Sequence, residues 1–585
     1  MIIDRLRSIY GEEVGDRTAA KMERLLARYR DRLPPPGPPG DRFDERDAVL
    51  ITYGDTFIEA GVKPLGALHD FATRHLEGRI STIHVLPFFP YSSDYGFSVI
   101  DYERVDPRLG GWEDIAELRT RFKLMFDLVL NHVSVQSDWF QGFLRDEPEY
   151  ERFFITVDPA TDLSGVTRPR TSPLLTRFET AVGPRWVWTT FSADQADLDY
   201  SNPEVLLRMV QVMLTYVERG ASLLRLDAVG YLWKEIGTPS VHLPRTHEVV
   251  RLLRDVLDLV APQVAIVTET NVPHRDNVSY FGDGRDEAQM VYQFPLAPLV
   301  LDAFARGDAR RLGGWLAELS TPSPETGFFD FLASHDGVGV VPARGLLSDV
   351  EVENLGRRVR ARGGEVSYKR NPDGSESPYE LNATFFDALS GPSEAREEWA
   401  TRLDRFVCSQ AVLLALAGVP GIYVHSLFGS HNYREGYERS GWKRDLNHER
   451  LDLELLERAL ADPATESAQV FGRVASLLEA RRSSSAFHPA SPQRVLASPP
   501  AVLAVRRGPR DGETVLTLHN LGSQPEQVGK DLLLEALPGG GAQDVLTGRR
   551  VTGAGTLLLA PYEVLWLRSM RTSPEAATST SSHRC

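Results

Sequence analysis

The chain has 585 residues, of which 42% are hydrophobic and 25% charged, a composition typical of a globular protein with a large core. Its net charge of −16 argues against nucleic acid as a partner, because a surface that binds phosphate backbones carries a basic excess. At this length we expect a catalytic body with smaller attached domains.

The cysteine count and the absence of long apolar stretches indicate the compartment. Cys408 and Cys585 are the only cysteines, so a disulfide framework is excluded and a reducing compartment is favoured. The opening residues MIIDRLRSIYGEE lack the apolar core of a secretion signal, and no apolar stretch is long enough to span a bilayer. We therefore expect a cytoplasmic protein without membrane contacts.

The predicted elements begin with a helix and continue with a strand–helix alternation. Residues 17–33 carry apolar residues at helical spacing and are followed by the proline-rich segment 34–40, so we interpret 1–45 as an N-terminal helical extension with a linker. Eight short apolar runs follow, most of them succeeded by a helical stretch: 49–55, 80–90, 123–133, 222–230, 263–270, 290–294, 328–336 and 418–426. Eight such units predict a parallel (β/α)8 barrel over 46–133 and 201–489.

Two connections within the predicted barrel are too long for simple loops. We interpret residues 134–200 as an inserted B domain and residues 338–383 as a second inserted subdomain, both over the mouth of the barrel. Residues 490–568 alternate apolar and polar positions, which predicts an all-β C-terminal domain. Residues 569–585 are predicted to be a disordered tail.

Polar residues end several of the predicted strands, at the barrel face where chemistry gathers. Period two places Arg225 and Asp227 on one face of a strand, so the guanidinium is expected to keep the carboxylate ionised, as a nucleophile requires. Glu269 follows the apolar run VAIV, and burial is expected to raise its pKa so that it holds a proton. Retaining glycoside cleavage needs two carboxyl groups about 5–5.5 Å apart, which neighbouring strand ends offer. Either acid alone is equally compatible with a strand end or a helix cap.

The ordered motifs DLVLNH, RLDAVG, TET and ASHD resemble the four conserved regions of glycoside hydrolase family 13, the α-amylase family. The resemblance covers nearly all of the chain outside the N-terminal extension and the tail. It implies a barrel with an inserted B domain and a β-sandwich C domain. By position it implies that Asp227 is the nucleophile, Glu269 the acid/base and Asp336 the transition-state stabiliser. It also implies a sugar-binding subsite that contains Arg225, His132 and His335.

Further segments resemble the sucrose phosphorylase branch of this family. They are YSSDYGFSVIDY and KRDLNHER. This resemblance implies that Asp94 and Arg444 grip the far hydroxyl groups of a glucosyl unit and that Phe97 forms an apolar platform.

A phosphorylase also needs cations that receive phosphate where a hydrolase admits water. The segment VTRPRTSP offers Arg168 and Arg170, and arginine matches phosphate in a bidentate geometry. The segment resembles the mobile phosphate-binding loop of the branch, in which Arg170 is the better positional match; a solvated pair of arginines is the alternative. The segment SPYELN resembles the second mobile loop and implies that Tyr379 lies near the acceptor.

Within the branch, the segments ITYGD, VTRPR, TETNVPH and HSLFGSHN look most like the glucosylglycerate phosphorylases, and the N-terminal extension fits the same group. Asn271 stands two residues after the acid/base, where sucrose phosphorylases tend to have histidine. A glycerate carboxylate requires donors or cations. The candidates are Asn271, His274, Lys234 and Arg170; the alternative for Lys234 is an ion pair with Glu235 or a neighbouring acid.

The resemblance therefore implies a retaining phosphorylase that converts 2-O-α-glucosylglycerate and inorganic phosphate into α-glucose 1-phosphate and glycerate through a β-glucosyl-aspartate intermediate. A sucrose or glucosylglycerol phosphorylase stays open, as does an α-glucosidase or transglucosylase of the same family; a non-enzymatic member is disfavoured because all three acids are present. The expected partners are a small glucoside, phosphate and a glycerate-like acceptor. We expect no cofactor and no metal, since neither a calcium loop nor zinc-ligand spacing occurs. The oligomeric state, a homodimer included, stays open.

Overall fold

The computed structural model describes residues 1–33, 35, 42–371, 375–390, 397–509, 512–537, 541–552 and 555–569. Most of the predicted linker, 34 and 36–40, lies outside these residues, and so does the predicted tail from residue 570 onward.

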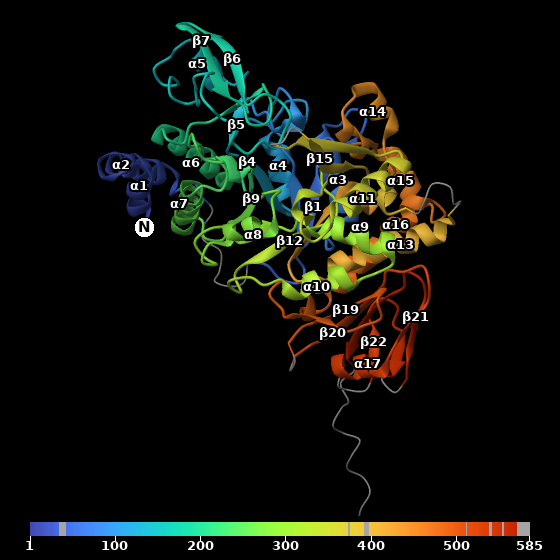
Figure 1. The fold of residues 1–585 in the computed structure, drawn as a ribbon. Coiled ribbons are helices and arrows are strands. Elements are labelled where there is room, and N and C mark those ends of the chain that lie inside the picture. The colour runs from blue at the N-terminus through green and yellow to red at the C-terminus, as the bar shows by residue number, and fades with distance from the viewer. Residues whose placement is uncertain are drawn as a thin grey trace, which may run out of the picture.

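Eight parallel strands form a closed barrel at the centre of the molecule (Figure 1). Around the barrel the order is β1-β16-β12-β11-β10-β9-β4-β3, so most strands lie beside their neighbours in the chain. Each strand overlaps one of the eight predicted runs, which confirms the predicted barrel. The strands are β1 (Val49–Thr52), β3 (Thr82–Val85), β4 (Lys123–Val129), β9 (Ala221–Asp227), β10 (Ala265–Thr268), β11 (Met290–Tyr292), β12 (Gly327–Phe331) and β16 (Val419–Tyr423).

Helices separate the barrel strands along the chain, and nearly all residues of the strands are buried because both faces of the sheet are covered. Helix α6 begins with local signals: the Asn202 side chain accepts a hydrogen bond from the Glu204 amide, and Pro203 occupies the first turn. The larger helices are α3 (Pro64–His75), α4 (Trp112–Arg119), α6 (Pro203–Glu218), α7 (Pro244–Val260), α9 (Leu296–Arg306), α10 (Arg310–Glu318), α13 (Trp399–Ala415), α15 (Leu453–Ala461) and α16 (Glu466–Arg482).

The long connection after β4 stays close to the barrel at its two ends and projects between them. Its first and last strands pair with each other, and His132 lies opposite Asp197 in that pair. Between them a hairpin of β6 and β7 extends away from the barrel, at the top of Figure 1. The elements are β5 (His132–Ser134), α5 (Asp138–Leu144), β6 (Leu175–Thr180), β7 (Gly183–Trp188) and β8 (Gln195–Asp197).

The long connection after β12 forms a three-stranded antiparallel sheet in the order β13-β15-β14. Its register shifts between Ser367 and Tyr368, which pair with Glu380 and Pro378, so that Tyr379 is an extra residue on β15. This is a β-bulge, which re-aims the side chains around it. The elements are β13 (Val338–Gly339), α11 (Asp349–Ala361), β14 (Glu365–Arg370) and β15 (Glu376–Asn382).

Two N-terminal helices pack against the side of the barrel. Helix α2 (Glu12–Tyr29) overlaps the predicted 17–33 helix, whereas α1 (Ile2–Tyr10) was not predicted. The Arg5 Nε atom lies 3.0 Å from Asp255 on α7, and the Tyr10 hydroxyl donates to the Tyr200 carbonyl. This extension is therefore fixed to the barrel by long-range contacts.

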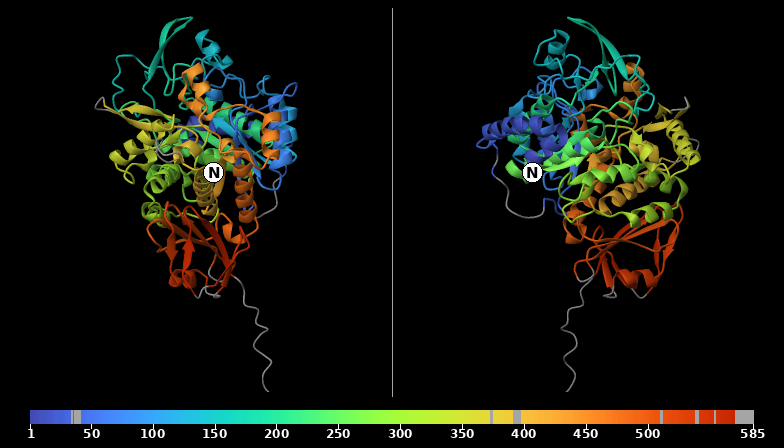
Figure 2. Two further views of the ribbon diagram at one scale, coloured as in Figure 1. Left: turned by 90° about the vertical axis from the view of Figure 1, so that its right-hand side faces the viewer. Right: turned by 60° about the vertical axis from the view of Figure 1, so that its left-hand side comes forward.

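The C-terminal region is rich in sheet, as predicted, and lies at the opposite end of the molecule from the β6–β7 hairpin (Figure 2). Helix α17 (Lys530–Ala536) interrupts the strands, which their alternation did not predict. The division into domains stays a prediction. The main sheet contains β18 (Gln493–Leu496), β19 (Val502–Arg507), β20 (Val515–Asn520), β25 (Val564–Ser569), β22 (Gly541–Asp544) and β23 (Arg550–Thr552), and a second pair contains β21 (Glu526–Val528) and β24 (Leu557–Leu559).

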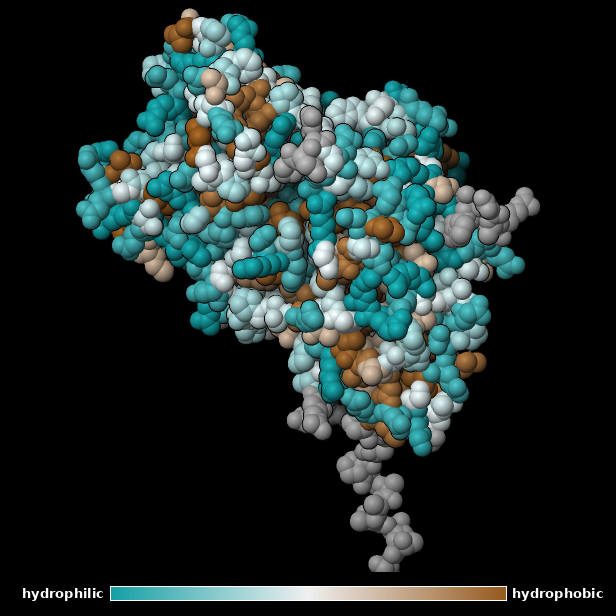
Figure 3. Space-filling view, viewed as in Figure 1, coloured by the Kyte–Doolittle hydropathy of each residue, from teal (hydrophilic) through white to brown (hydrophobic). Residues whose placement is uncertain are grey.

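Hydrophilic side chains cover most of the face seen in Figure 3, with small groups of apolar side chains among them. Among the described residues, no helix combines the length and the apolar character that crossing a bilayer requires. The described residues also contain no cluster of three or more His, Cys, Asp or Glu side chains arranged to hold a metal ion.

Candidate active site

A pocket contains side chains that follow several barrel strands, together with side chains from both long connections. All twelve site residues predicted from the sequence line it: Asp94, Phe97, His132, Arg170, Arg225, Asp227, Glu269, Asn271, His335, Asp336, Tyr379 and Arg444. Four further lining residues were not predicted: Phe191, Gln195, Ala228 and Glu380.

Asp227 and Arg225 stand on one face at the end of β9, as period two predicts. The Arg225 Nη1 atom lies 2.8 Å from Asp227 Oδ1 and also donates to Asp127 on β4, its ladder partner. Arg225 is only 1% exposed, and its guanidinium lies over the rings of Phe97 and Tyr292. Burial raises the pKa of Asp227 while Arg225 opposes the rise. The spacing of Arg225 and Asp227 predicts the effect of the arginine, whereas the effect of burial is visible only in the fold.

Glu269 follows β10, the neighbouring barrel strand. Its Oε2 atom accepts a hydrogen bond of 3.2 Å from the Ala228 amide and lies 3.9 Å from Arg225 Nη2. Ala228 reaches this position with a φ of 50°, in the left-handed region. Burial, together with the negative charges of Asp227 and Asp336, raises the pKa of Glu269 to about 7. Its carboxyl group can therefore hold a proton near neutral pH.

Asp336 follows β12 and contacts an arginine from the far side of the pocket. Its Oδ1 atom lies 2.6 Å from Arg444 Nη2, and Arg444 Nη1 lies 3.6 Å from Asp94 Oδ1. Burial alone would raise the pKa of Asp336, but Arg444 and the neighbouring cations hold that pKa well below its ordinary value. The same guanidinium keeps the pKa of Asp94 low against the effect of burial. Both carboxylates are therefore ionised hydrogen-bond acceptors.

One wall of the pocket is aromatic. The rings of Phe97 and His335 stack with centroids 5.0 Å apart. Burial lowers the pKa of His335 to about 3, so its imidazole is neutral. His132 Nε2 lies 3.0 Å from the Phe97 carbonyl, and Gln195 Nε2 donates to Asp94 at 3.1 Å. A neutral, flat wall with polar edges is suited to a sugar ring.

The first long connection contributes Arg170 to the pocket. Within the described part of the chain, no hydrogen bond or ion pair within 4 Å engages the Arg170 guanidinium, although Asp94 and Glu380 act on it at longer range. Arg168 lies outside the pocket lining, and its guanidinium donates to the Ser172 carbonyl. Of the two arginines, Arg170 is thus available to a ligand in this pocket.

The second long connection contributes two consecutive residues, Tyr379 and Glu380. Consecutive strand residues normally face opposite ways, and the bulge at Tyr379 explains why both reach the pocket. The Tyr379 hydroxyl lies 3.5 Å from Asn271 Nδ2, and Glu380 Oε1 lies 3.6 Å from Arg444 Nη2. Burial raises the pKa of Glu380.

Two of the residues considered for glycerate are not among those that line the pocket. Lys234 Nζ lies 2.6 Å from Asp197 Oδ2 and donates to Asn131, with a side chain only 3% exposed. His274 packs against the rings of Trp315 and Phe328. Of the four candidates for binding glycerate, the pocket lining therefore contains Asn271 and Arg170, whereas Lys234 neutralises a buried acid and His274 packs against aromatic rings.

The chain is similar to known proteins over most of its length. Residues 77–312 match the family model described as the α-amylase catalytic domain. The chain is 48% identical to a glucosylglycerate phosphorylase from Allomeiothermus silvanus over 97% of this chain and 98% of that protein. It is 30% identical to a sucrose phosphorylase from Agrobacterium vitis over 75% of this chain and 88% of that protein.

Among solved structures, sucrose 6F-phosphate phosphorylase from Thermoanaerobacter thermosaccharolyticum superposes with a TM-score of 0.71 at 24% identity, over 82% of this chain and 94% of that chain. This likeness supports the fold. The near-complete match to the curated relative decides the family: the chain belongs to the α-amylase family, glycoside hydrolase family 13, and within it to the glucosylglycerate phosphorylases.

Proposed function

We propose that the protein catalyses the reversible phosphorolysis of 2-O-α-glucosylglycerate to α-glucose 1-phosphate and glycerate by double displacement. The observation that carries this proposal is the pocket itself, in which the unengaged Arg170 guanidinium lines the same cavity as Asp227 and Glu269. A hydrolase needs no cation beside the catalytic pair, because its acceptor is water. A phosphorylase needs one there, because its acceptor is the phosphate anion.

In the first displacement, the Asp227 carboxylate attacks the anomeric carbon of the glucosyl unit. The bond from that carbon to the glycerate oxygen breaks, and Glu269 gives its proton to the departing oxygen. The raised pKa of Glu269, about 7, supports this role because the carboxyl group must be protonated when the substrate binds. The product of this step is a β-glucosyl ester of Asp227.

In the second displacement, phosphate occupies the space that glycerate has left. Glu269, now a carboxylate, takes a proton from phosphate, and the phosphate oxygen attacks the anomeric carbon while the ester bond to Asp227 breaks. Two inversions leave the α configuration of the glucosyl unit unchanged. Asp336 is proposed to stabilise the positive charge that develops on the sugar, which its low pKa favours because the group stays ionised.

The glucosyl unit is proposed to lie between the polar end of the pocket and the aromatic wall. Asp94 and Arg444 would bind its far hydroxyl groups, and Phe97 would contact its apolar face. His132, Arg225 and His335 complete this subsite.

Glycerate and phosphate are both anions and use the same open face of the glucosyl-enzyme in turn. The pocket lining contains five carboxylates and three arginines, and ion pairs engage two of those arginines, Arg225 and Arg444. We infer that Arg170 serves both anions, with Asn271 and Tyr379 as additional polar contacts. The relative at 48% identity supports glycerate as the acceptor over fructose, since the sucrose phosphorylase shares only 30% of its residues.

An acceptor panel tests this proposal. The protein is incubated with α-glucose 1-phosphate and with glycerate, fructose or glycerol, and phosphate release is measured for each. We expect the highest kcat/KM with glycerate. Fructose as the best acceptor would replace the proposal with a sucrose phosphorylase, and equal phosphate release without any acceptor would replace it with a hydrolase.

A further inference from the structure

The turn that carries Asp94 has an unusual backbone. Three successive residues in the 3-10 segment η1 (Asp94–Gly96) adopt positive φ angles: 53° at Asp94, 52° at Tyr95 and 105° at Gly96. A Cβ atom on Gly96 would lie 2.6 Å from the Pro87 carbonyl oxygen, so glycine is required there. Asp94 and Tyr95 have side chains, and the left-handed region costs them free energy that other contacts must offset.

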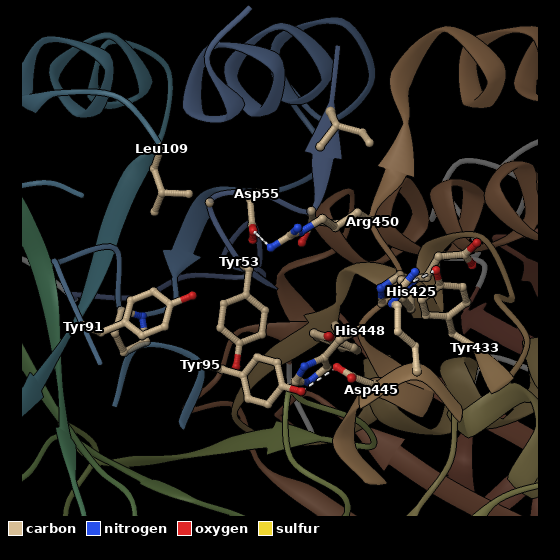
Figure 4. Close-up of a pocket in the computed structure, with 17 residues that line it drawn as sticks. Tyr53, Asp55, Tyr91, Tyr95, Leu109, His425, Tyr433, Asp445, His448 and Arg450 are labelled. Atoms are coloured by element: carbon tan, nitrogen blue, oxygen red, sulfur yellow. Dashed lines mark hydrogen bonds and ion pairs between the residues drawn. The ribbon is translucent and has the colours of Figure 1, made fainter. Parts of the chain in front are cut away.

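One side-chain contact joins this turn to the opposite side of the pocket. The Tyr95 hydroxyl donates a hydrogen bond of 2.5 Å to Asp445 Oδ1, shown as a dashed line in Figure 4. Asp445 directly follows Arg444 on the 3-10 segment η6 (Lys443–Asn447). Two adjacent pairs therefore face each other, with Asp94 3.6 Å from Arg444 and Tyr95 bonded to Asp445.

The Tyr95 side chain lies beside open space. A second cavity lies next to the turn, and Tyr95 is part of its lining together with Tyr53, Tyr91 and His448 (Figure 4). The Tyr95 ring contacts His448 edge-on with centroids 4.8 Å apart. Because this side of the turn is not densely packed, a turn without its hydrogen bond has room to relax away from Arg444.

We propose that Tyr95 is a positioning residue, whose hydrogen bond to Asp445 holds the strained turn so that Asp94 and Arg444 meet the glucosyl unit together. This inference rests on the proposed function, in which these two residues bind the far hydroxyl groups of the sugar. Gln195 also holds Asp94, through a contact of 3.1 Å, so loss of the Tyr95 contact weakens the arrangement without abolishing it.

A double-mutant cycle tests the coupling. Tyr95→Phe removes the hydroxyl donor, Asp445→Ala removes the acceptor, and the double variant removes both. With α-glucose 1-phosphate and glycerate, we expect Tyr95→Phe to raise the KM for α-glucose 1-phosphate by about tenfold and to change kcat much less, because a hydrogen bond to a charged group is lost and not a reacting group. The KM of the double variant for α-glucose 1-phosphate should be no higher than that of the more impaired single variant. Asp445→Asn keeps an acceptor oxygen and should retain most of the wild-type KM.

A second readout separates positioning from general destabilisation. α-Galactose 1-phosphate differs from the glucosyl donor in the orientation of one far hydroxyl group. If Tyr95 positions Asp94, the preference of kcat/KM for the glucosyl over the galactosyl donor falls in Tyr95→Phe. Tyr91→Phe is the matched control, since Tyr91 lines the same cavity but contacts Arg108 instead. Its KM and its preference should stay at wild-type values.

Additive effects in the cycle, or an unchanged donor preference in Tyr95→Phe, would overturn the positioning role. These outcomes differ from failure of the proposed function, in which the wild-type protein itself consumes no α-glucose 1-phosphate with glycerate present.

Discussion

Arg225 Nη1 lies 2.8 Å from Asp227 Oδ1, and the same nitrogen donates to Asp127 on the neighbouring strand. The Nη2 atom of the same guanidinium lies 3.9 Å from Glu269 Oε2. One buried cation is thus shared by three carboxylates, two of them the proposed catalytic pair. Burial raises the pKa of Asp227 and the negative charge of Asp127 adds to the rise, whereas Arg225 opposes it and its hydrogen bond fixes the orientation of the carboxylate.

The first prediction concerns the covalent step. Asp227→Asn is expected to lower kcat by about four orders of magnitude or more, because an amide cannot attack the anomeric carbon. The fold should persist, since the change is nearly isosteric, and circular dichroism checks this. Mass spectrometry of the wild-type protein with an activated glucosyl donor should find the adduct on Asp227; an adduct on any other residue contradicts the assignment.

The second prediction concerns pH. The pKa of Glu269 is raised to about 7, so the carboxyl group is protonated below that pH and loses its proton as the pH rises through it. Glu269 must be protonated when glucosylglycerate binds, because it gives that proton to the departing oxygen. We therefore expect kcat/KM for phosphorolysis to fall above about pH 7, by roughly tenfold per pH unit. An alkaline limb that persists unchanged in Glu269→Gln would assign the titration to another group.

The third prediction uses the leaving group. Glu269→Gln should slow glucosylglycerate far more than a donor whose leaving group departs without a proton, such as α-glucosyl fluoride. The comparison is made on the first half-reaction, followed through glucosyl-enzyme formation. Equal losses with both donors would show that Glu269 is not the acid.

The site residues that could be predicted from the sequence pattern are those that stand at the ends of barrel strands. Asp227, Glu269 and Asp336 follow apolar strands, and parallel strands bring their carboxyl ends together, so the pattern alone predicts that these side chains meet. Gln195 lies on β8, in the first long connection, and does not follow a barrel strand. Its position in the sequence therefore does not indicate that it reaches the pocket. Glu380 reaches the pocket through a β-bulge, and a bulge depends on pairing that a single sequence does not reveal.

The contacts of Lys234 also could not be predicted from the sequence. They lead to the fourth prediction. A lysine that follows the strand of the proposed nucleophile is chemically reasonable for binding glycerate, but here it neutralises Asp197 at 2.6 Å in the interior. Lys234→Met should destabilise the protein by about 3–5 kcal/mol, because it leaves a buried charge without its partner. Thermal unfolding measures this loss, and Lys234→Met with Asp197→Asn should recover part of it. The ratio of kcat/KM between glycerate and fructose should not change; a selective loss of glycerate would return Lys234 to the acceptor site.

The last prediction concerns the anion that reacts with the glucosyl-enzyme. Arg170→Ala removes a guanidinium that no ion pair within the described residues engages, so the pocket keeps its carboxylates but loses its free cation. Loss of a charge-assisted contact of about 1.5–3 kcal/mol should slow phosphorolysis by roughly one to two orders of magnitude, while hydrolysis of the glucosyl-enzyme, which needs only water, is spared. Arg170→Lys should recover little, since a point charge does not reproduce the planar fork. Arg168→Ala is the matched control, because Arg168 lies on the same segment but donates to the Ser172 carbonyl. If the ratio of phosphorolysis to hydrolysis stays constant in Arg170→Ala and falls in Arg168→Ala, phosphate binds at Arg168 and not at Arg170.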